Sequence, residues 1–253
     1  MKNFFALDRH ALLRYSQNES LSAPQVPRLN YLSVLEDKPR VQMKKFLLNR
    51  MFLVATVLGE VQEVPVFLER MFHNALKHHQ GEPVTGIALL YPDSVLIVLE
   101  SSSGSLYSVL RELDRPPEPG RDATPLQGMK ILVVSHDIPA RLFLQWHVSI
   151  VTVPIMYLED VTQSQSPEEV VTECLTLVLK LGMFLLKTIK AGTRFPGANL
   201  HQMAPELLIP EETIKYLSKC ELFMTPGQFL EMYNSPICVP MDSESVWPVP
   251  ASL

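Results

Sequence analysis

Between residues 51 and 153, short β-prone runs alternate with stretches of helical period, and this order leaves few folds open to the chain. The run from Phe52 to Leu58 is continuously β-prone and closes at Gly59. A run of this kind is typical of a strand that is covered on both faces. We therefore predict a first strand within Met51–Gly59, buried between two layers.

The stretch after Gly59 predicts an amphipathic helix of roughly four turns. Pro65 suits the first helical position, because a proline there loses no hydrogen bond. Residues 78–81 end the pattern. One apolar stripe along this helix is formed by Leu68, Phe72, Ala75 and Leu76.

A hairpin and a second helix are predicted next. Apolar runs at Val84–Tyr91 and Val95–Glu100 flank Pro92-Asp93-Ser94, a turn-forming set. The serines of residues 101–105 supply capping hydroxyls for the helix that follows. Its apolar face holds Leu106, Val109, Leu110 and Leu113.

Two further strands, Met129–Ser135 and Trp146–Val153, follow a proline-rich loop at residues 115–127. The resulting order is β-α-β-β-α-β-β. We expect an α+β fold of ferredoxin-like type, with two helices on one face of a five-stranded sheet. The other face of the sheet is apolar and needs a cover.

The C-terminal third supplies helices for that cover. Ser166 and Pro167 precede two glutamates, which is a strong helix start, and the apolar segment from Pro167 to about Lys190 has to be buried. The charged side chains within this segment would make a membrane span costly. Two shorter helices are predicted at Pro210–Lys219 and Pro226–Tyr233.

The predicted organisation has four parts. Residues 1–48 form a partly ordered arm and residues 49–155 form the sheet domain. Residues 156–234 form a helical extension packed on that domain, and residues 235–253 form a proline-rich tail. We expect sheet and helices to make one body, because the sheet cannot leave its second apolar face bare.

Composition narrows the function classes. The net charge is −5, with 27 acidic and 22 basic residues spread along the chain, so no basic field for nucleic acid is expected. The three cysteines lie far apart without Cys-x-x-Cys spacing, which fits reduced thiols in a cytosolic compartment. Asp8 and Arg9 interrupt the N-terminus too early for a signal peptide. We expect a cytoplasmic protein that binds neither nucleic acid nor membrane.

Three segments carry a resemblance to a known family: VTGIALLY at residues 84–91, VLIVLE at 95–100 and FLQWH at 143–147. In this order and at this spacing they resemble the BLUF family of flavin-binding blue-light sensors. The resemblance covers roughly residues 50–154. It implies a BLUF-type sheet of the order just predicted, which once held a flavin.

The residues that the resemblance implies for flavin chemistry are a tyrosine on the first strand, a glutamine on the third and asparagines near the end of the first helix. Here the first strand has no tyrosine, Ile97 takes the glutamine position, and His78 and His79 take the asparagine positions. Isoleucine forms no hydrogen bond, and imidazole lacks the paired donor and acceptor of an amide. Trp146 matches, yet a large aromatic residue packs there without a flavin. We expect a degenerate pocket and no cofactor.

A metal site is a weaker alternative. His73, His78 and His79 cluster at a helix end, and Glu69 could add a further ligand on the same face. Solvated histidines favoured by the dipole at a helix C-terminus explain the cluster better. We predict no bound metal.

Catalysis also has little support. Ser135, His136 and Asp137 are the residue types of a hydrolase triad, but neighbours on one strand point to opposite faces. The serines at 101–105 could hold a phosphate at a helix N-terminus, although capping explains them adequately. We predict no catalytic residues and no enzymatic activity.

The chain as a whole resembles a family of vertebrate testis-expressed proteins, which implies male germ cells. The leading hypothesis is a pseudo-sensor, a non-enzymatic scaffold that binds protein partners in a sperm flagellar (axonemal) assembly. The sequence is also compatible with a homodimer. The alternatives are a flavin or small-ligand sensor that uses Trp146, His78 and His79, and a cryptic hydrolase.

Overall fold

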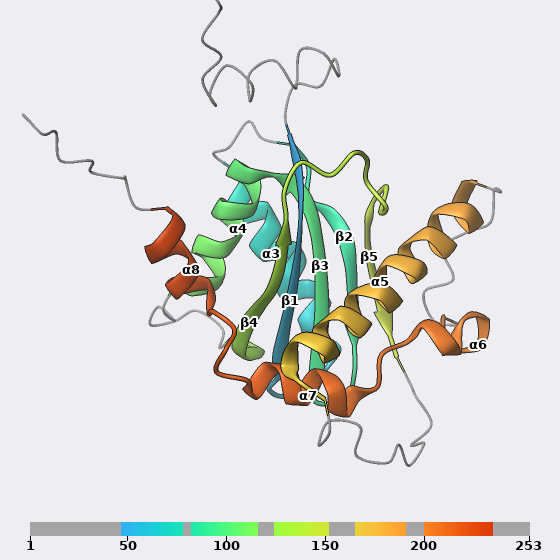
Figure 1. The fold of residues 1–253 in the computed structure, drawn as a ribbon. Coiled ribbons are helices and arrows are strands. Elements are labelled where there is room, and N and C mark those ends of the chain that lie inside the picture. The colour runs from blue at the N-terminus through green and yellow to red at the C-terminus, as the bar shows by residue number, and fades with distance from the viewer. Residues whose placement is uncertain (1–46, 78–81, 116–123, 152–164, 191–199, 235–253) are drawn as a thin grey trace, which may run out of the picture. The chain divides into compact units, whose positions relative to one another are not determined.

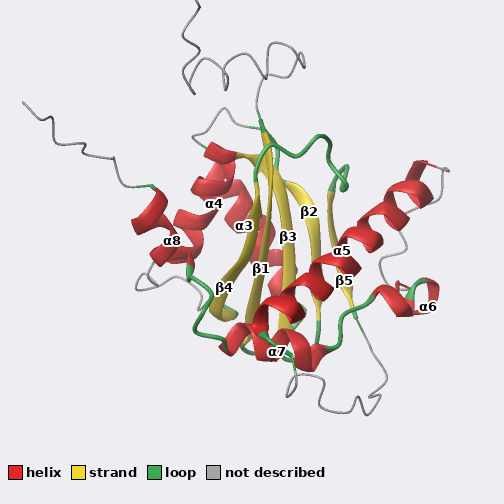
Figure 2. Cartoon of the chain, in the orientation of Figure 1, coloured by secondary structure: helices red, strands yellow, loops and turns green. Residues whose placement is uncertain are grey.

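The computed structural model describes residues 47–77, 82–115, 124–151, 165–190 and 200–234 (Figure 1). The predicted arm up to residue 46, the predicted tail at 235–253 and the pair His78 and His79 lie outside the described residues. Within these ranges the chain forms a five-stranded mixed sheet with helices on both of its faces (Figure 2).

The sheet has the strand order β4-β1-β3-β2-β5. β1 pairs antiparallel with β3 and β4, while β2 pairs antiparallel with β3 and parallel with β5. Because β4-β1-β3-β2 is the arrangement of a ferredoxin-like sheet, the predicted α+β class is confirmed. The strands are β1 (Leu48–Val57), β2 (Thr85–Leu90), β3 (Ser94–Ser102), β4 (Leu126–Ser135) and β5 (Trp146–Ile150).

One face of the sheet carries α3 (Glu63–Leu76) and α4 (Ser103–Asp114), as predicted. Helix α3 begins two residues before Pro65, so the proline is its third residue and not its first. The first backbone N–H groups of a helix have no intrahelical acceptor, and therefore a proline is tolerated anywhere in this turn.

The last helix, α8 (Pro226–Tyr233), also lies on the α4 side. Phe229 belongs to the same apolar cluster as α3 and α4, and its ring centroid lies 5.9 Å from that of Tyr107 on α4. The chain before α8 covers part of the edge of β4, where the Ile131 N–H donates to the Met224 carbonyl at 2.8 Å. The C-terminal helices are therefore divided between the two faces.

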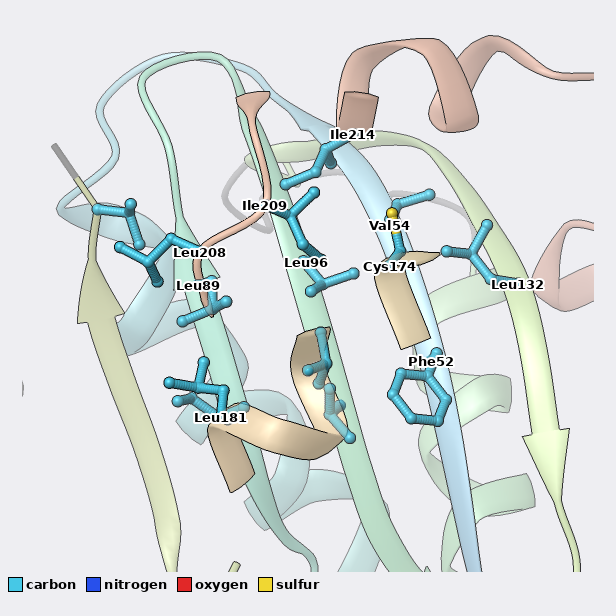
Figure 3. Packing of buried hydrophobic residues seen from close by; sticks show 14 of the residues in the cluster. Phe52, Val54, Leu89, Leu96, Leu132, Cys174, Leu181, Leu208, Ile209 and Ile214 are labelled. Carbon is cyan, nitrogen blue, oxygen red and sulfur yellow. The ribbon is translucent and has the colours of Figure 1, made fainter. Parts of the chain in front are cut away.

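The other face is covered by α5 (Pro167–Lys190) and α7 (Glu211–Lys219). Figure 3 shows Leu89, Leu96 and Phe52 of the sheet together with Cys174 and Leu181 of α5. Burial raises the pKa of the Cys174 thiol to about 12, as expected of a small buried side chain. None of the helices in the described ranges, α5 included, is long and apolar enough to cross a membrane.

Two short elements between α5 and α7 were not predicted. They are α6 (Leu200–Met203) and the 3₁₀ turn η3 (Pro205–Leu207). Neither is long enough to show a helical period in the sequence. They lead the chain to Leu208 and Ile209, whose buried side chains join the apolar cluster under α5 (Figure 3).

Polar contacts fix this C-terminal cover to the sheet. The Tyr91 hydroxyl at the end of β2 donates to the Ile209 carbonyl at 2.8 Å, and burial raises the pKa of Tyr91. At the β2–β3 turn, the Asp93 N–H donates to Glu211 at 2.9 Å, and Lys215 lies 3.0 Å from the Asp93 carboxylate. Burial lowers the pKa of Lys215, but the Asp93 hydrogen bond and the surrounding carboxylates outweigh it and raise that pKa.

Candidate functional site

Ile97, which stands at the glutamine position, lies in the middle of the apolar layer beneath α3 and α4. It is 1% exposed. Its neighbours across the sheet are Leu53 on β1 and Ala88 on β2, and both are fully buried. The side chain therefore fills the layer and offers no hydrogen bond.

From Met51 to Val57, strand β1 presents only apolar side chains to the same layer. Met51, Leu53, Ala55 and Val57 alternate along the strand and pack toward α3 and α4. None of these side chains carries a hydroxyl group. The tyrosine that the resemblance implies on the first strand has no counterpart at any of these positions.

Trp146 begins β5 and closes one side of this layer. Its ring meets Phe72 of α3 edge to face, with centroids 4.7 Å apart and planes at 83°. The buried indole Nε1 has no hydrogen-bond partner among the described residues. Because an unpaired buried donor costs about 1–3 kcal/mol, this atom is the feature of the layer that favours a polar ligand.

The predicted histidine cluster can be placed only in part. His73 and Glu69 are exposed on α3, while His78 and His79 lie outside the described residues. Among the residues that the structure does describe, no three His, Cys, Asp or Glu side chains gather as a metal site would require.

A buried ion pair lies at the opposite end of β3 from the β2–β3 turn, and the sequence reasoning missed it. Glu100 has no solvent exposure, and its Oε1 atom accepts a hydrogen bond from Arg50 Nε at 2.6 Å. Its Oε2 atom accepts from the backbone N–H groups of Leu142 and Phe143 at 3.0 and 3.2 Å. The sequence signal for this pair was the charged residue Glu100 at the end of an otherwise apolar run, together with Arg50 next to the predicted first strand.

Arg141 adds a second anchor for the same loop between β4 and β5. Its guanidinium donates to the Glu100 carbonyl at 2.6 Å and to the Thr85 hydroxyl at 2.8 Å. A third contact joins it to the Glu82 carboxylate at 3.2 Å. Residues 141–143 are thereby fixed to the segment 82–85 and to Glu100, and we call these contacts, together with the Arg50–Glu100 ion pair, the Glu100 latch.

The loop that the Glu100 latch holds packs against α5. Phe143 is buried beside Gly182 of that helix, and a Cβ atom on Gly182 would lie 3.2 Å from both Phe143 and Leu142. A glycine thus lets the helix approach the loop closely. The loop that Glu100 holds is therefore also part of the surface on which α5 rests.

Two of the three residues considered above as a hydrolase triad, His136 and Asp137 at the start of the β4–β5 loop, contact Asn49 instead. Asn49 Oδ1 accepts from the Asp137 N–H at 3.3 Å and lies 3.1 Å from His136 Nδ1. Asp137 has a positive φ of 52°, which turns the chain away from the strand. Ser135 is the last residue of β4, and among the described residues no hydrogen bond joins its hydroxyl to His136 as nucleophile to base.

The serine-rich turn supplies a capping hydroxyl to α4, as predicted. Ser102 caps α4 and accepts a hydrogen bond from the Ser105 N–H. The Ser101 and Ser105 hydroxyls both donate to the Glu82 carbonyl, at 2.8 and 2.9 Å. Ser103 is exposed and accepts from Asn49 Nδ2 at 2.8 Å.

The fold and these sites define a class: an α+β sheet protein of ferredoxin-like topology, with apolar layers on both faces of the sheet and a charged latch at one end. A family model, testis-expressed protein 47, matches residues 47–235, and the chain belongs to that family.

Solved structures similar to the chain include a BLUF protein and a light-regulated enzyme. BlrB, a BLUF protein in its dark state, is 17% identical with a TM-score of 0.32, over 43% of this chain and 74% of that one. A bacterial light-regulated adenylyl cyclase is 14% identical with a TM-score of 0.33, over 58% and 41%. Klebsiella pneumoniae BlrP1 is 16% identical with a TM-score of 0.32, over 44% and 27%. The chain thus spans less than half of the last two proteins.

Proposed function

We propose that this chain is a non-enzymatic scaffold that binds protein partners, built on a BLUF-like sheet that no longer holds flavin. The partners are those of a sperm flagellar (axonemal) assembly, and the protein works in the cytoplasm of male germ cells or in the flagellum. The family to which the chain belongs supports expression in testis. The absence of flavin chemistry rests on the residues beneath α3 and α4.

The observation that carries the proposal is Ile97 in its apolar surroundings. A flavin edge presents hydrogen-bonding atoms, and an amide side chain can pair with them where a hydrocarbon cannot. Leu53 and Ala88 on either side of Ile97 offer no substitute, since both are buried and apolar. Burying a polar flavin edge against this layer without partners would cost several kcal/mol. The residues of this layer therefore do not fit a flavin.

The second observation is the Glu100 latch. It fixes the loop between β4 and β5 to Glu100 with several charge-assisted hydrogen bonds. A light sensor has to transmit a change through its sheet, whereas hydrogen bonds tie this loop to Asn49 on β1, to Thr85 on β2 and to Glu100 on β3. A rigid sheet suits a protein that presents fixed surfaces to partners.

The alternative is a flavin or small-ligand sensor with an altered pocket. The unpartnered Nε1 of Trp146 favours it, because a bound acceptor would satisfy that donor. His78 and His79 would have to supply the remaining polar contacts. The alternative predicts a chromophore or ligand that purifies with the protein.

The test begins with the purified full chain. Its absorption spectrum is recorded before and after addition of FMN or FAD, and flavin fluorescence is titrated with the protein. We expect no flavin band after purification and no quenching beyond that caused by a matched amount of an unrelated protein. A stoichiometric yellow complex would overturn the loss of flavin binding.

The scaffold part of the proposal needs a separate test in sperm. The tagged chain is localised by microscopy, and detergent-extracted flagella are assayed for what they retain. We expect retention with the axonemal fraction, at salt that releases soluble proteins. Complete release together with the cytosolic enzymes would contradict a flagellar scaffold.

A further inference from the structure

Helix α5 carries its charges in two separate groups. Glu168, Glu169 and Glu173 stand in its first half, and Lys180, Lys187 and Lys190 stand in its second half. The side chains of Glu169, Glu173, Lys180 and Lys187 are exposed. Neither Lys180 nor Lys187 has a carboxylate three or four residues away on the helix, so the charges do not pair along α5 in the way that commonly stabilises exposed helices.

These four charges lie on one line. The exposed residues Glu169, Glu173, Thr176, Lys180, Met183 and Lys187 are spaced by four, three, four, three and four positions. This spacing places them on a single stripe about 27 Å long, since a helix rises about 1.5 Å per residue. The buried side of α5 faces the sheet, so the stripe points away from it. In Figure 1 no described element lies in front of this side of α5.

Apolar side chains border the stripe. Leu177 and Phe184 flank it on one side and Leu179 flanks it on the other, and each is only partly buried. Met183, on the stripe itself, is 48% exposed. A helix face with partly exposed leucines and with charges of both signs that do not pair with one another along the helix is suited to a partner helix of complementary charge order.

We propose that this stripe is a self-association surface, on which α5 of a second copy of the chain packs antiparallel. A two-fold axis at the level of Val178 puts Glu169 opposite Lys187 of the second copy, and Glu173 opposite Met183 and one turn from Lys180. By symmetry every such contact occurs twice. Leu177 then meets its own equivalent on one side of the axis, and Leu179 meets its equivalent on the other.

The charge order selects this orientation. A parallel pair would place glutamates against glutamates and lysines against lysines, which is unfavourable. An antiparallel pair brings opposite charges together at both ends. Exposed ion pairs contribute about 0.2–1 kcal/mol each, so the charges mainly specify the arrangement while the leucines and Met183 supply apolar contact. This inference does not depend on the loss of flavin, and it gives the proposed scaffold two copies of every surface.

The test measures the mass of the full chain by sedimentation velocity over a range of concentrations. We expect a monomer–dimer equilibrium that weakens as salt is raised, because salt screens the ion pairs. The variant Lys180→Glu/Lys187→Glu leaves the cap of α5 untouched and should weaken the dimer about tenfold or more. The variant Glu169→Lys/Glu173→Lys should do the same. A 1:1 mixture of the two variants should restore association as a heterodimer.

The matched control is Lys77→Glu/Lys219→Glu, which changes net charge equally at exposed lysines outside α5. It should dimerise like the wild type. Circular dichroism establishes that every variant is folded. A wild type that stays monomeric, a dimer indifferent to both α5 reversals, or a mixture that fails to associate would each overturn the proposal. Its outcome is separate from that of the flavin titration and the flagellar assay.

Discussion

The Glu100 carboxylate, which has no solvent exposure, lies 2.6 Å from the Nε atom of Arg50 on the neighbouring strand. Both residues sit at paired positions of β1 and β3. Two backbone N–H groups of the β4–β5 loop also donate to the carboxylate. A buried charge with so many donors has a structural role, because removal of either partner leaves the other unpaired in the interior.

Glu100→Leu should therefore destabilise the protein by about 3–5 kcal/mol, measured by urea unfolding. The loss leaves the Arg50 guanidinium and the N–H groups of Leu142 and Phe143 without their acceptor. The double variant Arg50→Met/Glu100→Leu should recover part of the loss, because the orphaned guanidinium is gone. Equal stabilities of Glu100→Leu and the wild type would contradict the latch.

Gly86→Ala should prevent normal pairing of β2 and β3. Gly86 has a φ of 148°, and a Cβ atom there would lie 1.8 Å from the Val98 carbonyl oxygen. The backbone would have to move, so we expect a loss of stability well above that of the control. Gly128→Ala is the matched control, since its φ of 62° is also positive but no heavy atom lies within 4 Å of its Cβ. The control should lose about 1–2 kcal/mol. Similar losses of stability for both variants would show that the positive φ alone, and not the clash with the Val98 carbonyl, causes the effect.

Tyr91→Phe should cost about 1–3 kcal/mol, because it leaves the Ile209 carbonyl without the hydroxyl that donates to it. The measurement is chemical unfolding at neutral pH. Tyr107→Phe, a change to a partly buried tyrosine on α4, is the matched control. If only Tyr107→Phe lost stability, the hydrogen bond from Tyr91 to Ile209 would not be what holds the C-terminal cover on the sheet.

Stability should fall in alkaline solution. Burial raises the pKa of both Tyr91 and Cys174 in the folded protein. Their unfolded forms titrate near pH 10 and pH 9. The contribution of each group is therefore fully present below its unfolded pKa and is lost as pH rises toward its folded pKa, because the unfolded state then binds fewer protons. Unfolding free energies at pH 8–11 should fall less steeply in Tyr91→Phe and in Cys174→Ala than in the wild type. Unchanged slopes in both variants would refute the assignment.

Sequence patterns predicted the regular elements well and the polar contacts poorly. Helix α5 begins at Pro167 and ends at Lys190 as predicted, because a capping serine, a proline and an apolar period mark it locally. Strand β5 ends at Ile150, earlier than the predicted Val153, and residues 152–164 lie outside the described residues. The run of β-prone residues gives no signal for where pairing with β2 stops.

The Glu100 latch could not be predicted because its members come from distant parts of the chain. Arg50 and Glu100 are paired only by the register of β1 and β3, and the sequence does not give that register. The face of the sheet that α8 covers could not be predicted either, because a helix of eight residues carries no information about the layer that it joins. The apolar character of Ile97, in contrast, was readable from the sequence, and its side chain is 1% exposed.

The most direct test of the central claim, that the layer around Ile97 does not receive a flavin, is thermal unfolding of the full chain with and without saturating FMN. A ligand that binds the native state stabilises it by about 2.7 kcal/mol at a concentration one hundred times its Kd. We predict no change in the unfolding midpoint, for the wild type and for Trp146→Phe alike. A rise in the wild-type midpoint that Trp146→Phe abolishes would contradict the account and identify the sensor alternative as correct.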